Sequence, residues 1–173
     1  MRVAAILPAL IVCAALGACG TVQRRPAITL EPGARPGAAG PNDILFRAIA
    51  LVGTPYRYGG NTPEGGFDCS GLVDYVFRDV AGIVLPRTAE DIARIDAPSV
   101  GRDRLESGDI VFFRHRGRNV AHVGIYVGEG RFVHAPNEGG TVRLDRLDEN
   151  YWRDHFSGAK RVLLPVKIAN RGS

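Results

Sequence analysis

Cys69 is the residue of this sequence whose type and setting most clearly suggest covalent chemistry. It lies between Asp68 and Ser70, directly after a glycine-rich stretch and at the predicted start of a helix. Free backbone N–H groups and the helix dipole favour a thiolate at such a position. The alternative is a small, inert hydrophobe in a helix interface, the usual fate of a single free cysteine. The polar neighbours and the glycine-rich loop favour the nucleophile.

A nucleophilic cysteine needs a base, and the chain contains four histidines. His115 lies in a basic turn, and His155 lies in a polar stretch near the C-terminus, so both are predicted at the surface. His122 and His134 fall on two predicted strands joined by a short glycine-containing turn. We therefore expect His122 to be the catalytic base and His134 to orient its ring.

The turn between these strands decides whether the two imidazoles can meet. If residues 128–130 form a three-residue hairpin loop, Val127 pairs with Arg131 and Gly124 faces His134. The two histidines then share one face of the sheet on a diagonal, with a backbone separation of about 7 to 8 Å. A two-residue turn would instead place them on opposite faces, because a slip of one residue inverts every side chain. The catalytic hypothesis therefore predicts the three-residue loop.

A zinc site is the alternative chemistry for Cys69, His122 and His134, since thiolate and imidazole are good zinc ligands. The sequence lacks the close ligand spacing that is typical of such sites. We therefore expect thiol catalysis, with neither a metal nor an organic cofactor.

The elements that must position these residues change character along the chain. Amphipathic periodicity predicts a helix over 43–52, ended by Gly53, and a second helix from Asp68 or Cys69 to Gly82. Short strands set off by turns follow at Asp109–Phe113, Val120–Val127, Arg131–Ala135, Thr141–Asp145 and Lys160–Val166. Helices first and strands later indicate an α+β domain, in which N-terminal helices pack on a mainly antiparallel sheet.

The N-terminal residues are typical of export. The apolar run Val3–Leu16 is too short to span a membrane but suits the core of a signal peptide. It ends in Leu16-Gly17-Ala18-Cys19, which resembles the lipobox of bacterial lipoproteins. We therefore expect a signal peptide over 1–18 and a lipid (palmitate-bearing) anchor on Cys19; ordinary cleavage that leaves Cys19 free is the alternative.

Composition sets the remaining boundaries. Residues 19–41 are rich in proline and glycine and are predicted to be a tether, followed by one catalytic domain over 42–168 and a tail over 169–173. Of the three cysteines, only Cys69 falls in that domain, so no disulfide is expected within it. The net charge of +4 suits an anionic cell-wall polymer or lipid surface, and no nucleic-acid signature is present.

Five ordered motifs carry a resemblance to a known family: Phe67-Asp68-Cys69-Ser70-Gly71-Leu72-Val73, Leu85-Pro86-Arg87-Thr88, Gly108-Asp109-Ile110-Val111-Phe112-Phe113, His122-Val123-Gly124-Ile125-Tyr126 and Phe132-Val133-His134-Ala135. Together they resemble the NlpC/P60 cysteine peptidases. The resemblance implies a papain-like fold and a Cys69-His122-His134 triad. It also implies that the Tyr56 hydroxyl stabilises the oxyanion and that Asp68 and Ser70 contact the stem peptide.

The resemblance further implies that the substrates are the stem peptides of peptidoglycan. These are cut between D-glutamate and diaminopimelate or at the crosslink from diaminopimelate to D-alanine. The segments 151–153 and 160–163, with the lipobox, resemble single-domain murein endopeptidase lipoproteins, which favours the crosslink. A non-catalytic wall-binding adaptor on the same fold is the other possibility. We expect a monomer. By resemblance to enteric lipoproteins, in which an aspartate after the lipidated cysteine favours inner-membrane retention, Gly20 after Cys19 indicates the outer membrane, facing the periplasm.

Overall fold

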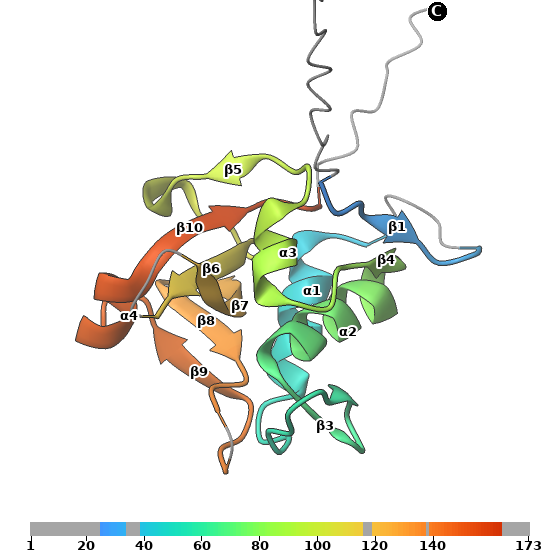
Figure 1. Cartoon of the computed structure of the whole chain (residues 1–173), viewed down its shortest axis with the longest axis horizontal. Coiled ribbons are helices and arrows are strands. Elements are labelled where there is room, and N and C mark those ends of the chain that lie inside the picture. Colours follow the sequence, from blue (N-terminus) through green and yellow to red (C-terminus); the bar gives the residue numbers. More distant parts are fainter. Residues whose placement is uncertain (1–24, 34–38, 116–118, 138, 164–173) are drawn as a thin grey trace, which may run out of the picture.

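The computed structural model of the chain describes residues 25–33, 39–115, 119–137 and 139–163. Three helices precede most of the strands: α1 (Pro41–Ala50), α2 (Cys69–Ala81) and α3 (Ala89–Arg94). A short 3-10 helix, η1 (Arg102–Arg104), follows, and helix α4 (Asn150–His155) lies near the C-terminal end of the domain. Figure 1 shows α1, α2 and α3 on one side of the sheet and α4 at its outer side.

A six-stranded antiparallel sheet forms the other half of the domain. In spatial order its strands are β5 (Ser99–Val100), β10 (Phe156–Lys160), β6 (Ile110–Arg114), β7 (Val120–Gly128), β8 (Arg131–His134) and β9 (Arg143–Arg146). Two small antiparallel pairs lie outside it: β1 (Thr29–Leu30) with β4 (Ile83–Val84), and β2 (Asn61–Thr62) with β3 (Gly66–Phe67). The expected α+β class with a mainly antiparallel sheet is confirmed.

Alternation along the strands buries both faces of the sheet. On β6, Ile110 and Phe112 pack with the helices, whereas Val111 and Phe113 point to the opposite face. There Trp152 of α4 covers them together with neighbouring apolar residues. The expectation of helices on one side is therefore incomplete, because a six-residue helix carries part of a second core.

Helix α2 begins and ends as the sequence predicts. The Asp68 carboxylate accepts a hydrogen bond from the backbone N–H of Gly71 at 2.7 Å and caps the first turn. Gly82 ends the helix in the left-handed conformation, with φ of 65°. The cap places Cys69 at the first helical position, which is the position that the catalytic hypothesis requires.

The last strand lies elsewhere than the sequence predicts. It covers Phe156–Lys160 rather than Lys160–Val166, whose final residues lie outside the described part of the chain. Gly158 weakens the strand signal in the sequence, but its φ of 145° and a register shift beside it let β10 bend past β6. Smaller shifts occur at α1, which begins at Pro41, and at β9, which begins at Arg143.

Part of the predicted tether is joined to the domain. Thr29 and Leu30 pair with β4, and the Glu31 N–H donates to the Gly82 carbonyl at 2.8 Å. The contacts of the domain therefore begin upstream of residue 42. The predicted signal peptide, Cys19 and the tail over 169–173 lie outside the described residues. Within those that are described, no helix has the length and apolar character needed to cross a membrane.

Candidate active site

Cys69 lines an open cavity of about 840 Å³ between the helices and the sheet. The segment around the α2 N-terminus forms one wall, through Tyr56, Asp68 and Ser70 among others. The facing walls come from residues 87–91, which lead into α3, and from the start of β7 at Val120. Three of the residues predicted for the site, together with the cysteine itself, thus line one cavity.

His122 and His134 share one face of the sheet, as the catalytic hypothesis requires. His122 Nε2 lies 2.9 Å from His134 Nδ1, and the two rings are nearly perpendicular, at 87°. Gly124 makes this approach possible, because a Cβ at that position would lie 2.9 Å from the Val133 carbonyl and 3.2 Å from the His134 Cβ. The expected hydrogen-bonded pair is therefore present.

The turn that produces this arrangement differs from the predicted one. Gly128, not Val127, pairs with Arg131, so the loop has only two residues, Glu129 and Gly130, with φ of 53° and 72°. The three-residue loop was therefore wrong. The register shifts between Tyr126 and Gly128, which makes Val127 an extra residue on β7. This bulge restores the side-chain alternation that a two-residue turn alone would have inverted.

The thiol lies against the strand that carries the histidines. Cys69 packs against a buried cluster that includes Val123 of β7, the residue next to His122. Because His122 Nε2 is bound to His134, the other ring nitrogen, Nδ1, is the one that can take a proton from sulfur.

The pKa shifts at the site favour an uncharged thiol and an uncharged imidazole. Burial raises the pKa of Cys69, and the negative charge of Asp68 raises it further, against hydrogen bonds from the backbone of Val123 and Ser70. Burial, assisted by His134, lowers the pKa of His122 to about 3. The raised pKa of Cys69 opposes the thiolate expected at the helix start, because desolvation and the adjacent carboxylate both disfavour the charged form.

Alkylation should reveal this state directly. We expect Cys69 to react slowly with iodoacetamide at neutral pH and the rate to rise about tenfold per pH unit through the alkaline range, because only the thiolate reacts. The measurement is mass-spectrometric quantification of the alkylated Cys69 peptide between pH 4 and 10. A rate plateau that extends to acid pH and disappears in His122→Ala would contradict it, since that profile indicates an ion pair.

Asp145, which the sequence reasoning did not assign to the site, lies directly behind the histidines. His134 Nε2 is 2.9 Å from Asp145 Oδ2, and the His134 side chain is fully buried. The Trp152 indole N–H donates to the same carboxylate oxygen at 2.9 Å, and Arg143 holds both oxygens. Hydrogen bonds from His134 and Arg143 outweigh burial and keep the pKa of Asp145 below its ordinary value.

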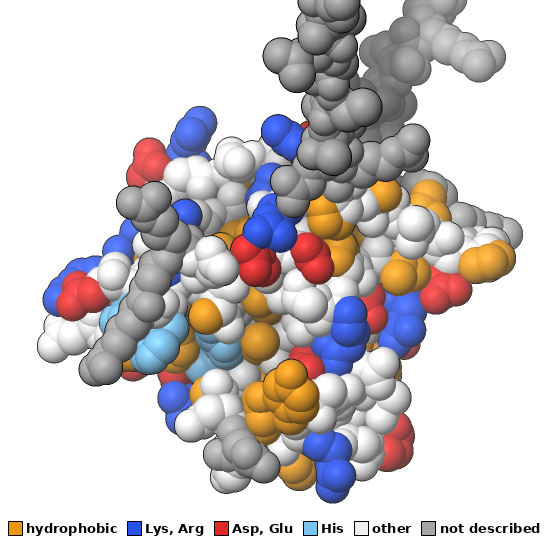
Figure 2. Space-filling model, viewed as in Figure 1, with side chains coloured by type: hydrophobic (Ala, Val, Ile, Leu, Met, Phe, Trp, Pro, Cys, Tyr) orange, Lys and Arg blue, Asp and Glu red, His pale blue; other side chains and the backbone are white. Residues whose placement is uncertain are grey.

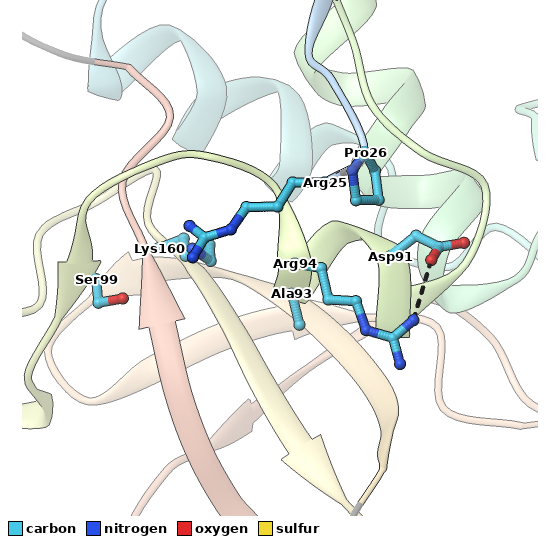
Figure 3. A pocket seen from close by; sticks show the side chains of 7 residues that line it. All are labelled: Arg25, Pro26, Asp91, Ala93, Arg94, Ser99 and Lys160. Atoms are coloured by element: carbon cyan, nitrogen blue, oxygen red, sulfur yellow. Dashed lines mark hydrogen bonds and ion pairs between the residues drawn. The ribbon is translucent and has the colours of Figure 1, made fainter. Parts of the chain in front are cut away.

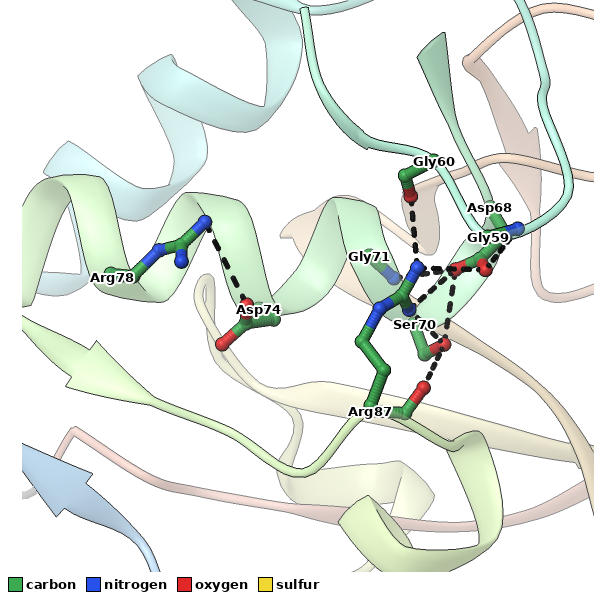
Figure 4. A network of polar contacts seen from close by, with 8 residues as sticks. All are labelled: Gly59, Gly60, Asp68, Ser70, Gly71, Asp74, Arg78 and Arg87. Carbon is green, nitrogen blue, oxygen red and sulfur yellow. Dashed lines mark hydrogen bonds and ion pairs between the residues drawn. The ribbon is translucent and has the colours of Figure 1, made fainter. Parts of the chain in front are cut away.

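Asp68 and Ser70 belong to a network centred on Arg87 (Figure 4). The Arg87 guanidinium donates to both Asp68 oxygens at 2.9 Å and to the Ser70 hydroxyl at 2.9 Å. The Ser70 hydroxyl in turn donates to the Arg87 carbonyl at 2.7 Å, and Asp68 also accepts from the backbone of Gly59 and Gly71. Although burial opposes it, Arg87 holds the pKa of Asp68 below its ordinary value. These bonds fix the start of α2; a stem-peptide contact by Asp68 or Ser70 stays a prediction.

Two glycines let the loop before α2 approach it closely. A Cβ at Gly71 would lie 2.1 Å from the Gly60 carbonyl oxygen, and one at Gly60 would lie 2.3 Å from the Gly66 carbonyl oxygen. The Gly60 carbonyl also accepts from Arg87 and from the Asp68 N–H, so it cannot move alone. The close backbone approach that the glycine-rich sequence predicts is confirmed.

Gly71→Ala tests this contact. In an unobstructed helix the change would stabilise the protein by up to about 1 kcal/mol. Here we expect the free energy of unfolding to fall by about 2 kcal/mol, because backbone must move. Urea denaturation of both proteins measures it, and a stabilised variant would show that the approach is not tight.

The other predicted residues occupy distinct places. Tyr56 is half-buried on the wall of the cavity that holds Cys69, and its oxyanion role stays a prediction. His115 contacts the Tyr151 hydroxyl at 3.2 Å, and its ring stacks on that of His155, apart from the residues that line the cavity. Figure 2 shows histidine side chains gathered over the sheet side of the molecule.

The zinc alternative conflicts with the geometry. One nitrogen of His122 and one of His134 are hydrogen-bonded to each other rather than directed at a common point. Across the described ranges, no group of three Cys, His, Asp or Glu side chains is arranged to hold a metal ion.

A second cavity, of about 640 Å³, lies between the N-terminal segment, α3 and β10 (Figure 3). Its basic side chains already have protein partners. Arg94 pairs with Glu90 and Asp91, Arg25 pairs with Asp96, and Lys160 Nζ donates to the carbonyls of Ile95 and Ala97. This cavity therefore lacks the nucleophile and the free charges of a reaction site, and the Cys69 cavity is the candidate.

Comparison with known proteins identifies the family of this chain. The NlpC/P60 family model matches residues 53–161. Murein DD-endopeptidase MepH of Escherichia coli K12 is 47% identical over 126 residues, which are 72% of this chain and 46% of MepH. Murein DD-endopeptidase MepS/Murein LD-carboxypeptidase of the same organism is 41% identical over 120 residues, 69% of this chain and 62% of that protein. The chain thus spans less than two thirds of either relative.

The fold agrees as well. A crystal structure of an NlpC/P60 family protein from Bacillus cereus superposes with a TM-score of 0.68 at 29% identity, over 72% of this chain and 41% of that one. The papain-like fold expected from the motifs is therefore confirmed. The chain belongs to the NlpC/P60 family.

Proposed function

We propose that this protein is a cysteine peptidase that hydrolyses peptide bonds in peptidoglycan. The observation that carries the proposal is the position of Cys69 at the start of α2, where it lines an open cavity and packs against a cluster that includes Val123 of β7. The neighbouring residue on that strand, His122, is hydrogen-bonded to His134 of β8. Both relatives named above are murein endopeptidases, which gives the substrate class.

The proposed reaction passes through a thioester. His122 Nδ1 takes the Cys69 proton as sulfur attacks the carbonyl carbon, so the uncharged pair becomes an imidazolium and a bound oxyanion only in the transition state. By the family resemblance, the Tyr56 hydroxyl would stabilise that oxyanion. His122 then protonates the leaving amine, and a water molecule that it deprotonates hydrolyses the thioester and restores the thiol.

The crosslink between diaminopimelate and D-alanine is the bond we favour. The names of both relatives contain the term DD-endopeptidase, which supports this choice over the bond from D-glutamate to diaminopimelate. Mass analysis of the products from defined crosslinked and uncrosslinked muropeptides decides between them. Cleavage confined to crosslinked muropeptides is the expected result.

The cellular place that we propose follows from the N-terminal sequence. Signal cleavage before Cys19 and lipid on its thiol would anchor the domain at the outer membrane, facing the periplasm. We expect the mature N-terminal peptide to carry the lipid mass and Cys19→Ser to move the protein from the membrane to the soluble fraction. An unmodified Cys19 in the mature protein would contradict the anchor and leave the peptidase proposal standing.

The deciding experiment uses isolated sacculi. The purified protein should release soluble muropeptides, as a known wall hydrolase added in parallel does, and Cys69→Ala should release none. Binding of sacculi without release, under conditions in which the known hydrolase is active, would contradict the peptidase and favour the non-catalytic adaptor.

A further inference from the structure

The hydrogen-bonded chain behind Cys69 does not end at His134. Asp145 stands diagonally from His134 across β8 and β9, as His134 stands diagonally from His122 across β7 and β8. We propose that Asp145 is a positioning residue that fixes the tautomers of both histidines and so leaves His122 Nδ1 unprotonated toward the thiol. Its effect on catalysis rests on the proposed function, whereas the tautomers themselves do not.

The direction of the hydrogen bonds from His122 through His134 to Asp145 follows from the chemistry of the Asp145 carboxylate. An ionised carboxylate only accepts hydrogen bonds, so His134 Nε2, which is 2.9 Å from Asp145 Oδ2, must carry a proton. A neutral imidazole has one N–H, so His134 Nδ1 is then an acceptor. His122 Nε2, 2.9 Å from that nitrogen, must therefore donate, and the proton of His122 cannot be on Nδ1.

The opposite direction is chemically unproductive. If His134 Nδ1 donated to His122 Nε2, the unprotonated His134 Nε2 would face the Asp145 carboxylate, which places two acceptors 2.9 Å apart. The proton of His122 would then lie on Nδ1, and no base would remain for the Cys69 proton. The carboxylate therefore selects the one tautomer of His122 that can act as the base.

Besides His134, two side chains keep Asp145 ionised and in place. The Trp152 indole N–H donates to Oδ2 at 2.9 Å, while Arg143 donates through Nη2 to Oδ2 at 2.9 Å and through Nε to Oδ1 at 3.0 Å. The Trp152 ring also stacks on His122, with centroids 5.4 Å apart and an angle of 27°. Trp152 of α4 thus contacts both His122 and Asp145, the first and last residues of this hydrogen-bonded series. The lowered pKa of Asp145 agrees with an ionised carboxylate at neutral pH.

Nitrogen-15 NMR of the histidine-labelled wild type at neutral pH reads the tautomers without any substrate. We expect the signals of His122 and His134, assigned by their loss in the two single alanine variants, to show protonation at Nε2 in both rings. Protonation at Nδ1 in either ring would overturn the proposal, whether or not the protein cleaves sacculi. The expected tautomers in a protein that fails to cleave sacculi would instead contradict only the proposed function.

Asp145→Asn tests the cause, because an amide N–H can donate to His134 Nε2. We expect its NMR spectrum to lose the paired Nε2 protonation and its kcat on a defined muropeptide to fall on the order of 100-fold, with KM changed less than about threefold. Unchanged tautomers and kcat in a folded Asp145→Asn protein would overturn the proposal. If this variant does not fold, the tautomers measured in the wild-type protein still test the proposal.

Two further variants separate the carboxylate from its surroundings. Arg146 and Asp148 form an exposed ion pair with the same two-residue spacing as Arg143 and Asp145, so Asp148→Asn is the matched control and should change neither the tautomers nor kcat. Arg143→Gln keeps the carboxylate and should retain both tautomers, with less than about a tenfold loss in kcat. Altered tautomers in Arg143→Gln but not in Asp145→Asn would overturn the proposal.

Discussion

Cys69→Ala is expected to reduce muropeptide release from sacculi by on the order of 10⁴-fold or more, to the level of a protein-free control. The reason is that a thioester requires a thiol, and Cys69 is the one cysteine within the described part of the chain. The measurement is chromatographic quantification of soluble muropeptides with matched protein concentrations.

Stability provides the control for this variant. Cys69 is only partly buried, so removing one sulfur atom should lower the free energy of unfolding by about 1 kcal/mol or less. The activity loss would then not reflect unfolding. Retention of even a tenth of wild-type release by a folded Cys69→Ala protein would show that the thiol is not the nucleophile.

His122→Ala should cost nearly as much as Cys69→Ala, whereas His134→Ala should leave a larger residual rate. His122 is the proposed base, and without it the uncharged Cys69 thiol that the pKa shifts favour has no proton acceptor. His134 acts only through the His122 ring, so we expect a loss on the order of 100- to 1,000-fold when it is removed. Steady-state rates on a defined muropeptide compare the two.

The double variant sharpens this comparison. Residues that act as one unit are strongly non-additive, so Cys69→Ala combined with His122→Ala should be no slower than either single variant. Equal rates for His122→Ala and wild type would place the base elsewhere. Thermal unfolding should accompany the His134→Ala assay, because that change leaves a hole in a fully buried position and removes a partner of Asp145.

The sequence predicts the parts of the site that depend on local pattern. The position of α2, and with it that of Cys69, follows from a capping residue, an apolar stripe and a terminal glycine. The positions of both histidines follow from the alternation on β7 and β8. The same-face arrangement was correct although the turn was not. A bulge at Val127 and a two-residue turn give the same parity as a three-residue loop, and periodicity alone cannot distinguish them.

Features that depend on contacts between residues far apart in the sequence cannot be predicted from local patterns. The irregular segment between β8 and β9 sets which β9 residue lies behind His134, so Asp145 could not be assigned. Arg87 belongs to one of the family motifs, yet the partners of its guanidinium lie 17 to 27 positions away in the sequence. The raised pKa of Cys69 opposes the predicted thiolate, because the desolvation that raises it depends on packing, which a local pattern does not reveal.

The pairing of β1 with β4 also determines how far the reaction lies from the point where the N-terminal segment joins the domain. Strand β4 begins just after α2 ends, whereas Cys69 is the first of the 13 residues of that helix. At 1.5 Å per residue, the helix separates the two points by about 20 Å. Helix α2 therefore fixes the distance between the Cys69 thiol and the point where the N-terminal segment joins the domain. A longer segment before Thr29 would let the whole domain move farther from its N-terminus but would leave this distance unchanged.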